Sequence, residues 1–207
     1  MPKVTPDHKE QRKQTILDAA QSVFLGKGYQ LATVDDIAAR SGLSVGALYR
    51  YFPTKSDIML TLLERKLGRA PEILQRLTQD IAGAWPRLQR CIEIFVHALH
   101  VRHPSTGRFL IVAWGEAIQD NTVRKGLQGR YAELVDYLAS IIDEGIAAGE
   151  FLPGAESWVI ASMLVGMADG ITLYWSTGTP GMDLRAMRFT TLQMLRNYLT
   201  PLAIREE

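Results

Sequence analysis

The sequence predicts an all-α protein, and three observations carry that prediction. Apolar residues recur at helical spacing through almost the whole chain, and no alternating strand pattern competes with them. The breaks between the periodic stretches hold capping and turn residues, such as the run from Gly178 to Gly181. With 47% apolar and 22% charged residues, the 207-residue chain has the composition of a globular protein, which excludes collagen-like and low-complexity chains.

The first predicted helices are short and separated by glycines. An apolar face runs through residues 16–24, and two glycines then end the first helix. Thr33 is placed as the N-cap of a second helix, with two acids in the first turn, where the helix dipole favours them. This second helix ends at Gly42, which suits the left-handed residue of a sharp turn.

Two further helices follow at once. Ser44 caps a third short helix, from Val45 to Tyr51, which Pro53 ends. Thr54 caps a longer fourth helix over residues 54–67. The periodicity and the breaks then predict six more helices, near residues 71–82, 86–102, 106–119, 122–148, 155–177 and 183–199.

The stretch from Trp158 to Trp175 is apolar enough to raise the question of a membrane span. It contains Asp169, and 18 residues only just reach spanning length. An aspartate at the bilayer centre costs roughly 2.5–3.5 kcal/mol. We therefore expect a buried helix of a protein outside the membrane. The first fifteen residues hold no apolar core of a signal peptide, and a single cysteine, Cys91, excludes an internal disulfide.

The net charge of +1 conceals an asymmetry between the two parts of the chain. Residues 1–69 carry 11 Lys and Arg against 7 Asp and Glu, whereas residues 70–207 carry 12 against 15. A basic front end on a mildly acidic body is typical of a module that binds a polyanion, joined to something else.

The stretch from Thr33 to Lys55 predicts a helix-turn-helix, because two short helices are joined by Ser-Gly-Leu-Ser. Small residues at the start of the second helix let its backbone enter a major groove, where Val45 and Ala47 can touch thymine methyl groups. Ser44, Tyr49, Tyr51 and Lys55 suit phosphate contacts. An ordinary helical hairpin is the alternative. The predicted DNA-contacting residues are Thr33, Ser44, Val45, Gly46, Ala47, Tyr49, Arg50, Tyr51 and Lys55.

The pattern is longer than a bare motif. It contains, in order, an Ala-Ala…Phe helix, Gly-Tyr before the capping Thr33, Asp-Ile-Ala, Ser-Gly-Leu-Ser, Leu-Tyr-Arg-Tyr-Phe, and Thr-Lys with an acid at Asp57. On these parts, residues 16–64 resemble the DNA-binding domain of TetR-family transcriptional regulators over its whole length.

The resemblance implies a cytoplasmic homodimer on a near-palindromic operator in double-stranded DNA. Such a protein usually represses transcription until a small molecule binds its C-terminal domain. We expect a DNA-binding domain over residues 1–54 and an effector-binding and dimerisation domain over residues 55–207, linked by the helix 54–67. The arm 2–10 is long enough to reach a minor groove, although such arms are more often disordered.

For the dimer interface, small residues recur every four positions in one late helix and permit close helix approach, and the helix before it carries an apolar stripe. The resemblance places a four-helix bundle between subunits on these two helices. Packing of the small face within one subunit is the alternative. The predicted interface residues are Leu127, Tyr131, Leu134, Leu138, Ser162, Gly166 and Gly170.

For an effector pocket, all four tryptophans lie in the body, together with methionines that suit a flexible apolar or amphipathic molecule. Ordinary core packing is the alternative for each of them. Glu116 and Asp169 are candidates for fixing a polar end of the ligand. The predicted ligand-binding residues are His97, His100, Phe109, Trp114, Glu116, Met163, Met167 and Tyr174.

A metal site is a weaker interpretation. Glu93, His97 and His100 share one helix face, and His103 lies about 120° away from His97 on helical spacing. A solvated or hydrogen-bonded face explains the same spacing, so no metal and no cofactor is expected.

An enzyme is not expected either, because the chain has no glycine-rich phosphate loop, no zinc-binding cysteine pair and no Gly-x-Ser-x-Gly elbow. A nucleophilic role for Cys91 near His97 is less favoured than simple burial. The remaining alternative is a DNA-binding regulator without a small-molecule effector, controlled by a protein partner or by its own abundance.

Overall fold

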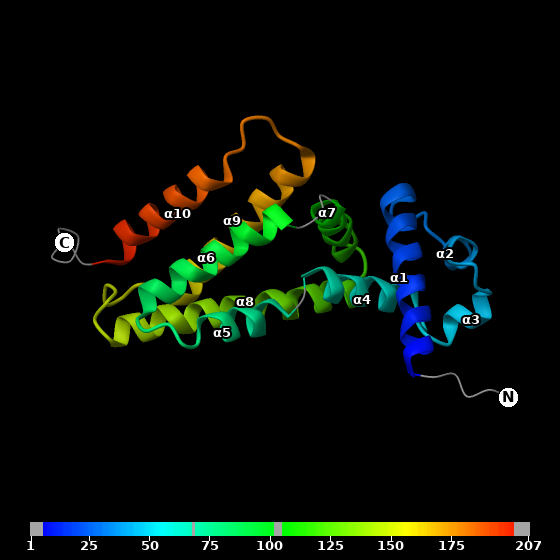
Figure 1. Cartoon of the computed structure of the whole chain (residues 1–207), viewed down its shortest axis with the longest axis horizontal. Coiled ribbons are helices and arrows are strands. Elements are labelled where there is room, and N and C mark those ends of the chain that lie inside the picture. The colour runs from blue at the N-terminus through cyan, green and yellow to red at the C-terminus, as the bar shows by residue number, and fades with distance from the viewer. Residues whose placement is uncertain (1–5, 68, 102–104, 201–207) are drawn as a thin grey trace. The chain divides into compact units, whose positions relative to one another are not determined.

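The computed structural model describes residues 6–67, 69–101 and 105–200. Within these ranges the chain forms ten α-helices and no strand, which confirms the predicted all-α fold. Figure 1 shows them in chain order. The helices are α1 (Pro6–Lys27), α2 (Val34–Ser41), α3 (Val45–Tyr49), α4 (Lys55–Leu67), α5 (Ala70–Thr78), α6 (Ala84–Val101), α7 (Ser105–Ala117), α8 (Asn121–Ala147), α9 (Ser157–Thr177) and α10 (Leu184–Leu199).

The contacts divide the chain into two compact units that are not continuous in sequence. Unit 1 comprises residues 1–68 and 105–128, and so contains α1 to α4, α7 and the start of α8. Unit 2 comprises residues 69–104 and 129–207, with α5, α6, most of α8, α9 and α10. The functional division expected at residue 54 stays a prediction.

Helix α1 begins at Pro6, ten residues before the apolar face that the periodicity shows. Its first turns are polar on every side, so no hydrophobic stripe marks them, but Glu, Gln, Lys and Arg are good helix formers. Of the predicted arm 2–10, residues 2–5 lie outside the described residues and the rest is helical.

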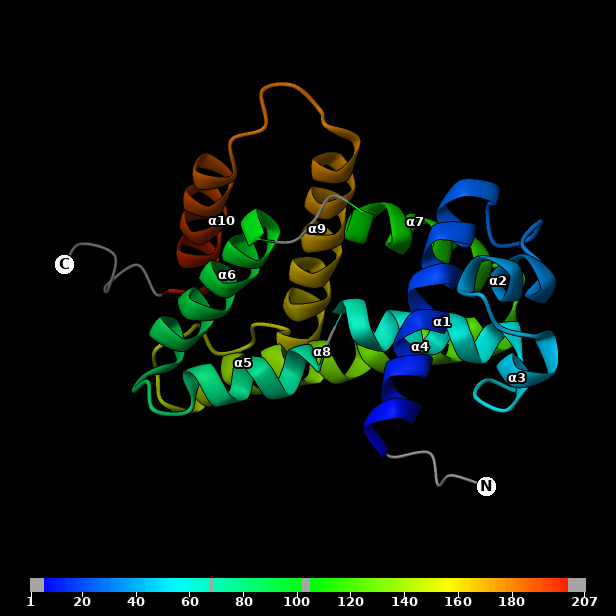
Figure 2. The same ribbon diagram turned by 45° about the vertical axis from the view of Figure 1, so that its right-hand side comes forward.

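The core of unit 1 lies between α1 and the helices that contact it. Figure 2 shows α2 and α3 near α1, and α1 also contacts α4 and α7. Ile16, Ala20 and Phe24 of α1 are fully buried, and the Phe24 ring packs against that of Tyr29 with centroids 4.9 Å apart. Burying each large apolar side chain contributes about 1.5–3 kcal/mol, so this small core fixes the short helices.

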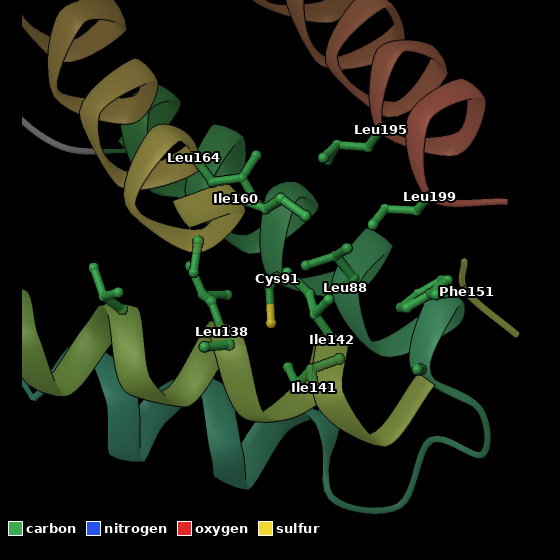
Figure 3. Packing of buried hydrophobic residues seen from close by; sticks show 14 of the residues in the cluster. Leu88, Cys91, Leu138, Ile141, Ile142, Phe151, Ile160, Leu164, Leu195 and Leu199 are labelled. Carbon is green, nitrogen blue, oxygen red and sulfur yellow. The ribbon is translucent and has the colours of Figure 1, made fainter. Parts of the chain in front are cut away.

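The core of unit 2 joins α6, α8, α9 and α10. Figure 3 shows Leu88 and Cys91 of α6 facing Leu138 and Ile142 of α8, with Ile160 of α9 beside them. Burial raises the pKa of the Cys91 thiol to about 12. A thiol that stays protonated at neutral pH is a poor nucleophile, so Cys91 is a core residue.

Two local features fix the turn between α8 and α9 against α6. The Glu150 carboxylate accepts hydrogen bonds from the Ala84 N–H at 3.0 Å and the Trp85 N–H at 3.1 Å, and so caps the start of α6. Gly145 has no side chain where the Phe151 ring lies. A methyl group there would also come within 2.8 Å of the Ala84 Cβ.

Helix α9 is buried on one face only, which corrects the expectation of a buried helix. Ile160, Ala161 and Leu164 are buried, but Trp158 is 58% and Met163 is 70% exposed. By length and composition α9 alone, among the described helices, is apolar enough to cross a membrane, and 22% of its most apolar window is buried. Its apolar residues run round the helix, so periodicity did not separate the two faces.

Candidate nucleic-acid interface and its connections

The turn between α2 and α3 has the geometry that its sequence predicts. Thr33 caps α2 reciprocally, since its hydroxyl accepts the Asp36 N–H at 3.1 Å and the Asp36 carboxylate accepts the Thr33 N–H at 3.0 Å. Gly42 ends α2 with φ of 68°, in the left-handed region where a side chain is unfavourable. The chain then enters α3 three residues later, at Val45.

Helix α3 is a single short turn with one buried anchor. Leu48 is fully buried, and the Ser44 hydroxyl caps the helix by accepting the Ala47 N–H at 3.2 Å. The opposite face carries Gly46, Tyr49 and Arg50, all exposed. A helix held from one side, with small and polar groups on the other, can be inserted into a major groove.

The other predicted DNA-contacting residues lie around this helix. Val45, Ala47 and Tyr51 are half-buried, whereas the side chains of Thr33 and Ser44 are exposed at two helix N-termini. Backbone N–H groups and hydroxyls at helix N-termini are suited to phosphate oxygens.

Lys55 differs from the other predicted phosphate ligands. Its ammonium donates hydrogen bonds to the Tyr29 carbonyl at 2.8 Å and the Ala32 carbonyl at 3.0 Å, and lies 4.2 Å from the centroid of the Tyr29 ring. The sequence predicted a phosphate contact for Lys55 near the start of α4, and that contact stays a prediction. The structure shows that Lys55 links α4 to the turn between α1 and α2, because the lysine stem is long enough to reach two carbonyls of that turn.

Helix α4 is tied to both neighbours at its first turn. Thr54 and Asp57 form a second reciprocal cap, with the Asp57 carboxylate 2.9 Å from the Thr54 N–H. The Ser56 hydroxyl lies 2.5 Å from the Asp120 carboxylate and 3.3 Å from the Tyr29 hydroxyl. Burial raises the pKa of the Tyr29 phenol to about 12, so it is neutral at physiological pH.

Glu116 was predicted to hold a ligand, but it already has a partner in unit 1. Its carboxylate is 5% exposed and accepts the Gln30 side-chain N–H at 2.6 Å. On the same helix, Phe109 is fully buried and Trp114 is 46% exposed. The structure therefore places three predicted ligand residues on α7 in unit 1.

The remaining ligand candidates belong to unit 2 and are not gathered into a core. His97 is exposed, and the side chain of His100 lies outside the described residues. Met163, Met167 and Tyr174 are 70%, 37% and 57% exposed. They lie on the open face of α9, because positions 163, 167 and 174 recur on one side at helical spacing.

The metal interpretation of the α6 face is not favoured by its contacts. The Glu93 carboxylate lies 3.2 Å from Arg90 and 3.6 Å from Arg188, so arginines occupy it. Among the residues that the structure describes, no group of three or more metal-ligating side chains comes together. His103 is outside them.

The predicted dimer residues fall into two sets. Leu127 and Leu138 of α8 are buried within the chain, and Tyr131 and Leu134 are half-buried against the core of unit 2. The α8 stripe therefore packs inside the subunit, whereas the role of the small face in a dimer stays a prediction. Gly166 is exposed, and Ser162 and Gly170 are partly so.

Further apolar residues share that open face but were not singled out from the sequence. On α9 the small residues are surrounded by Trp158, Val159 and Leu173, and α10 exposes Phe189, Met194 and Tyr198 at 60–63%. The Thr191 hydroxyl of α10 lies 3.8 Å from the Met167 sulfur of α9. We call these exposed residues of the two helices the α9–α10 face. On α10, the isolated apolar residues Phe189, Met194 and Tyr198 among polar ones could have indicated an exposed apolar face from the sequence.

One polar pair inside unit 2 is also notable. Asp169 of α9 interacts with Tyr131 of α8, and burial raises the pKa of the Asp169 carboxyl. Asp169 was predicted from the sequence to fix a ligand's polar end, and this role stays a prediction.

Comparison with known proteins agrees with this geometry. Residues 16–62 match the family of bacterial regulatory proteins of the tetR type, and residues 86–202 match the C-terminal domain of BetI-type transcriptional repressors. The fatty acid metabolism regulator protein of Bacillus subtilis is 28% identical and is aligned over 90% of this chain and 95% of its own.

Solved structures give the same result. The FadR regulator from Bacillus subtilis, in complex with stearoyl-CoA, superposes with a TM-score of 0.72 at 27% identity, over 88% of this chain and 96% of its own. A transcriptional regulator from Saccharomonospora viridis in complex with choline has the same fold, with a TM-score of 0.73 at 24% identity over 93% and 99% of the chains. These relatives are transcriptional regulators and not enzymes, and this chain belongs to the TetR family of bacterial transcriptional regulators.

Proposed function

We propose that the protein is a sequence-specific repressor that binds a near-palindromic operator as a homodimer and is released by a small molecule. The observation that carries this proposal is α3. Its buried Leu48 and its Ser44 cap hold it as a rigid turn, while Gly46, Tyr49 and Arg50 face outward. In a dimer, two such helices spaced by one DNA turn, about 34–36 Å, fit successive major grooves.

The proposed dimer forms through the α9–α10 face. This face brings together exposed Trp158, Met163 and Tyr174 of α9 with Phe189 and Met194 of α10. An exposed apolar area of this kind marks an interaction surface, and glycines on α9 allow a partner helix to approach closely. A second copy is the occupant we propose, because an operator with two half-sites needs two identical readers.

The proposed effector is an apolar or amphipathic molecule that acts in the cytoplasm, with a fatty acyl-CoA as the first candidate. The support is the stearoyl-CoA complex of the Bacillus subtilis FadR, which has 27% identity to this chain. Choline, present in the Saccharomonospora viridis complex, is the second compound to test. Effector binding in the body shifts α4 and spoils the spacing of the two α3 helices, so DNA must weaken effector binding by the same factor.

The first experiment measures fluorescence anisotropy of the purified protein on the DNA that flanks its own gene, titrated across salt. A dimer that holds about eight to ten phosphates gives a log–log slope of about −7 to −9. Scrambled DNA of equal length is the control for sequence selectivity. Two results together would overturn the proposal. The first is a shallow salt slope with equal affinity for both DNAs, and the second is a selection from random sites that yields no preferred sequence.

Stearoyl-CoA and choline are then added to the complex. Release of operator DNA by either compound, but not by free coenzyme A or betaine, supports effector control. A complex that neither they nor a panel of amphipathic compounds can release favours the second candidate, a regulator controlled by a protein partner or by its abundance.

A further inference from the structure

We infer that the end of α7 and the start of α8 control the DNA-binding helices through a set of contacts that we call the corner latch. This inference rests on the proposed function and assigns positioning roles to residues outside α2 and α3. The latch consists of the Gln30–Glu116 and Ser56–Asp120 hydrogen bonds and the packing of Leu60 against Gly126.

The Gln30–Glu116 contact holds the turn between α1 and α2. Glu116 lies in the last turn of α7, and the 2.6 Å hydrogen bond reaches it from a residue 86 positions earlier. Loss of a hydrogen bond to a buried carboxylate leaves that carboxylate unsatisfied, which costs more than the bond itself contributes. Any rotation of α7 that withdraws Glu116 therefore acts directly on the turn before α2.

Asp120 joins two helices through one carboxylate. One oxygen caps α8 by accepting the Thr122 N–H at 2.7 Å and the Val123 N–H at 3.1 Å. The other oxygen accepts the Ser56 hydroxyl at 2.5 Å. Because the cap fixes the carboxylate to α8, the first turn of α4 follows the N-terminus of α8.

The third contact keeps α4 close to α8. The Leu60 side chain occupies the space where a Cβ of residue 126 would stand. Glycine at this position thus lets the two helices approach by about the width of a methyl group. Helix α8 continues without a break into unit 2, so it provides a covalent route from the body to the latch.

From the latch a chain of hydrogen bonds reaches the helix-turn-helix by a second route besides α4. Ser56 contacts the Tyr29 hydroxyl at 3.3 Å, and its neighbour Lys55 donates to the carbonyls of Tyr29 and Ala32. Ala32 directly precedes Thr33, the cap of α2. Movement of α8 is therefore passed both along α4 and through the turn before α2, and both routes converge on α3.

A purely structural role would give the same contacts but would not link DNA binding to α7 and α8. Linkage is reciprocal, so operator binding at α3 must alter the stability of the latch if the inference holds. Hydrogen exchange of the full-length protein, with and without saturating operator DNA, measures this link without any effector.

In the wild type we expect operator DNA to slow exchange of the amides in residues 113–124 by about five-fold or more, besides those of α3. The double variant Gln30→Met and Ser56→Ala removes both hydrogen bonds and retains side chains of similar size. It should keep protection of α3 by DNA and lose it at residues 113–124. The matched control is Gln21→Ala, which removes a 3.1 Å hydrogen bond from Arg65 between α1 and α4 and leaves the latch intact.

Two results would overturn the inference: protection of residues 113–124 that is equal in the double variant and the wild type, or wild-type protection confined to α2 and α3. Failure of the proposed function looks different, since α3 itself would gain no protection from any DNA. If the double variant does not fold, Ser56→Ala alone gives the same comparison, with about half the contacts removed.

Discussion

The two units of the protein are specified by contacts of different range. In unit 1, the caps of α2, α3 and α4 each join residues three positions apart, such as Thr33 with Asp36 and Ser44 with Ala47. In unit 2, Glu150 caps α6 from 66 positions away, and Thr78 contacts Tyr137 across 59. The helices α2 to α4 are thus capped by neighbouring residues, whereas the start of α6 is capped through tertiary packing.

The difference also has a functional consequence. A module whose shape is set by local caps keeps its geometry while the body around it changes, so one DNA-binding scaffold can serve bodies that respond to different molecules. The long-range contacts of unit 1, at Glu116 and Asp120, join the locally capped helices to α7 and α8.

The largest expected effect comes from a charge introduced on the α9–α10 face, which tests whether the dimer interface can be lost while both units stay folded. Met163→Asp should leave both units folded, because Met163 is 70% exposed, but it should prevent dimerisation and operator binding. A charge buried unpaired in an interface costs about 2–5 kcal/mol. Sedimentation and anisotropy measure the two effects, and Ala82→Asp, at an exposed residue outside the face, is the control. If the Met163→Asp variant is still a dimer, the dimer interface lies on another surface of the protein.

Substitutions at two glycines of unit 2 test whether the stability of the subunit and the stability of the dimer depend on different residues. Gly145→Ala should lower the free energy of unfolding by about 1–3 kcal/mol, because the new methyl group meets the Phe151 ring and the Ala84 Cβ. At Gly166 a methyl group meets no atom of its own chain. Gly166→Ala should therefore preserve subunit folding while weakening the dimer. Urea unfolding monitored at several protein concentrations separates the two, and equal effects on both quantities would contradict the assignment.

The sequence allowed prediction of features that depend on neighbouring residues. The cap at Thr33, the left-handed Gly42 and the exposed α3 all follow from local chemistry, and the structure has them. It did not reveal the partners of Lys55 and Glu116, because nothing in their local pattern indicates a residue 23 to 86 positions away. The open face of α9 was also hidden, since a helix apolar on all sides gives no direction to its burial.

Lys55 provides a test that distinguishes a hydrogen bond within unit 1 from a contact to DNA phosphate. Lys55→Met should lower the free energy of unfolding by about 1–3 kcal/mol, because two turn carbonyls lose their donor. It should also reduce operator affinity while changing the salt slope little. A lysine that mainly binds phosphate behaves in the opposite way, since its removal lowers the slope by about 0.9 per phosphate and leaves stability unchanged. Tyr49→Phe, on the exposed side of α3, is the comparison variant, because it removes a predicted phosphate contact.

The smallest expected effect concerns Asp169 and the pH dependence of unit 2. Its pKa is raised by burial, so between the pKa of the unfolded chain, near 4, and the higher pKa of the native state, the folded protein binds more protons. The free energy of unfolding must therefore fall as pH rises through that window. Asp169→Asn keeps the size of the side chain and removes its titration, so the stability of the variant relative to wild type should increase from pH 4 to pH 7. The measurement is the urea-unfolding free energy of both proteins at pH 4, 5, 6 and 7. An equal pH dependence of the two free energies would contradict a raised pKa of Asp169 in the native state, because the wild type would then release no proton in this range beyond those that the variant releases.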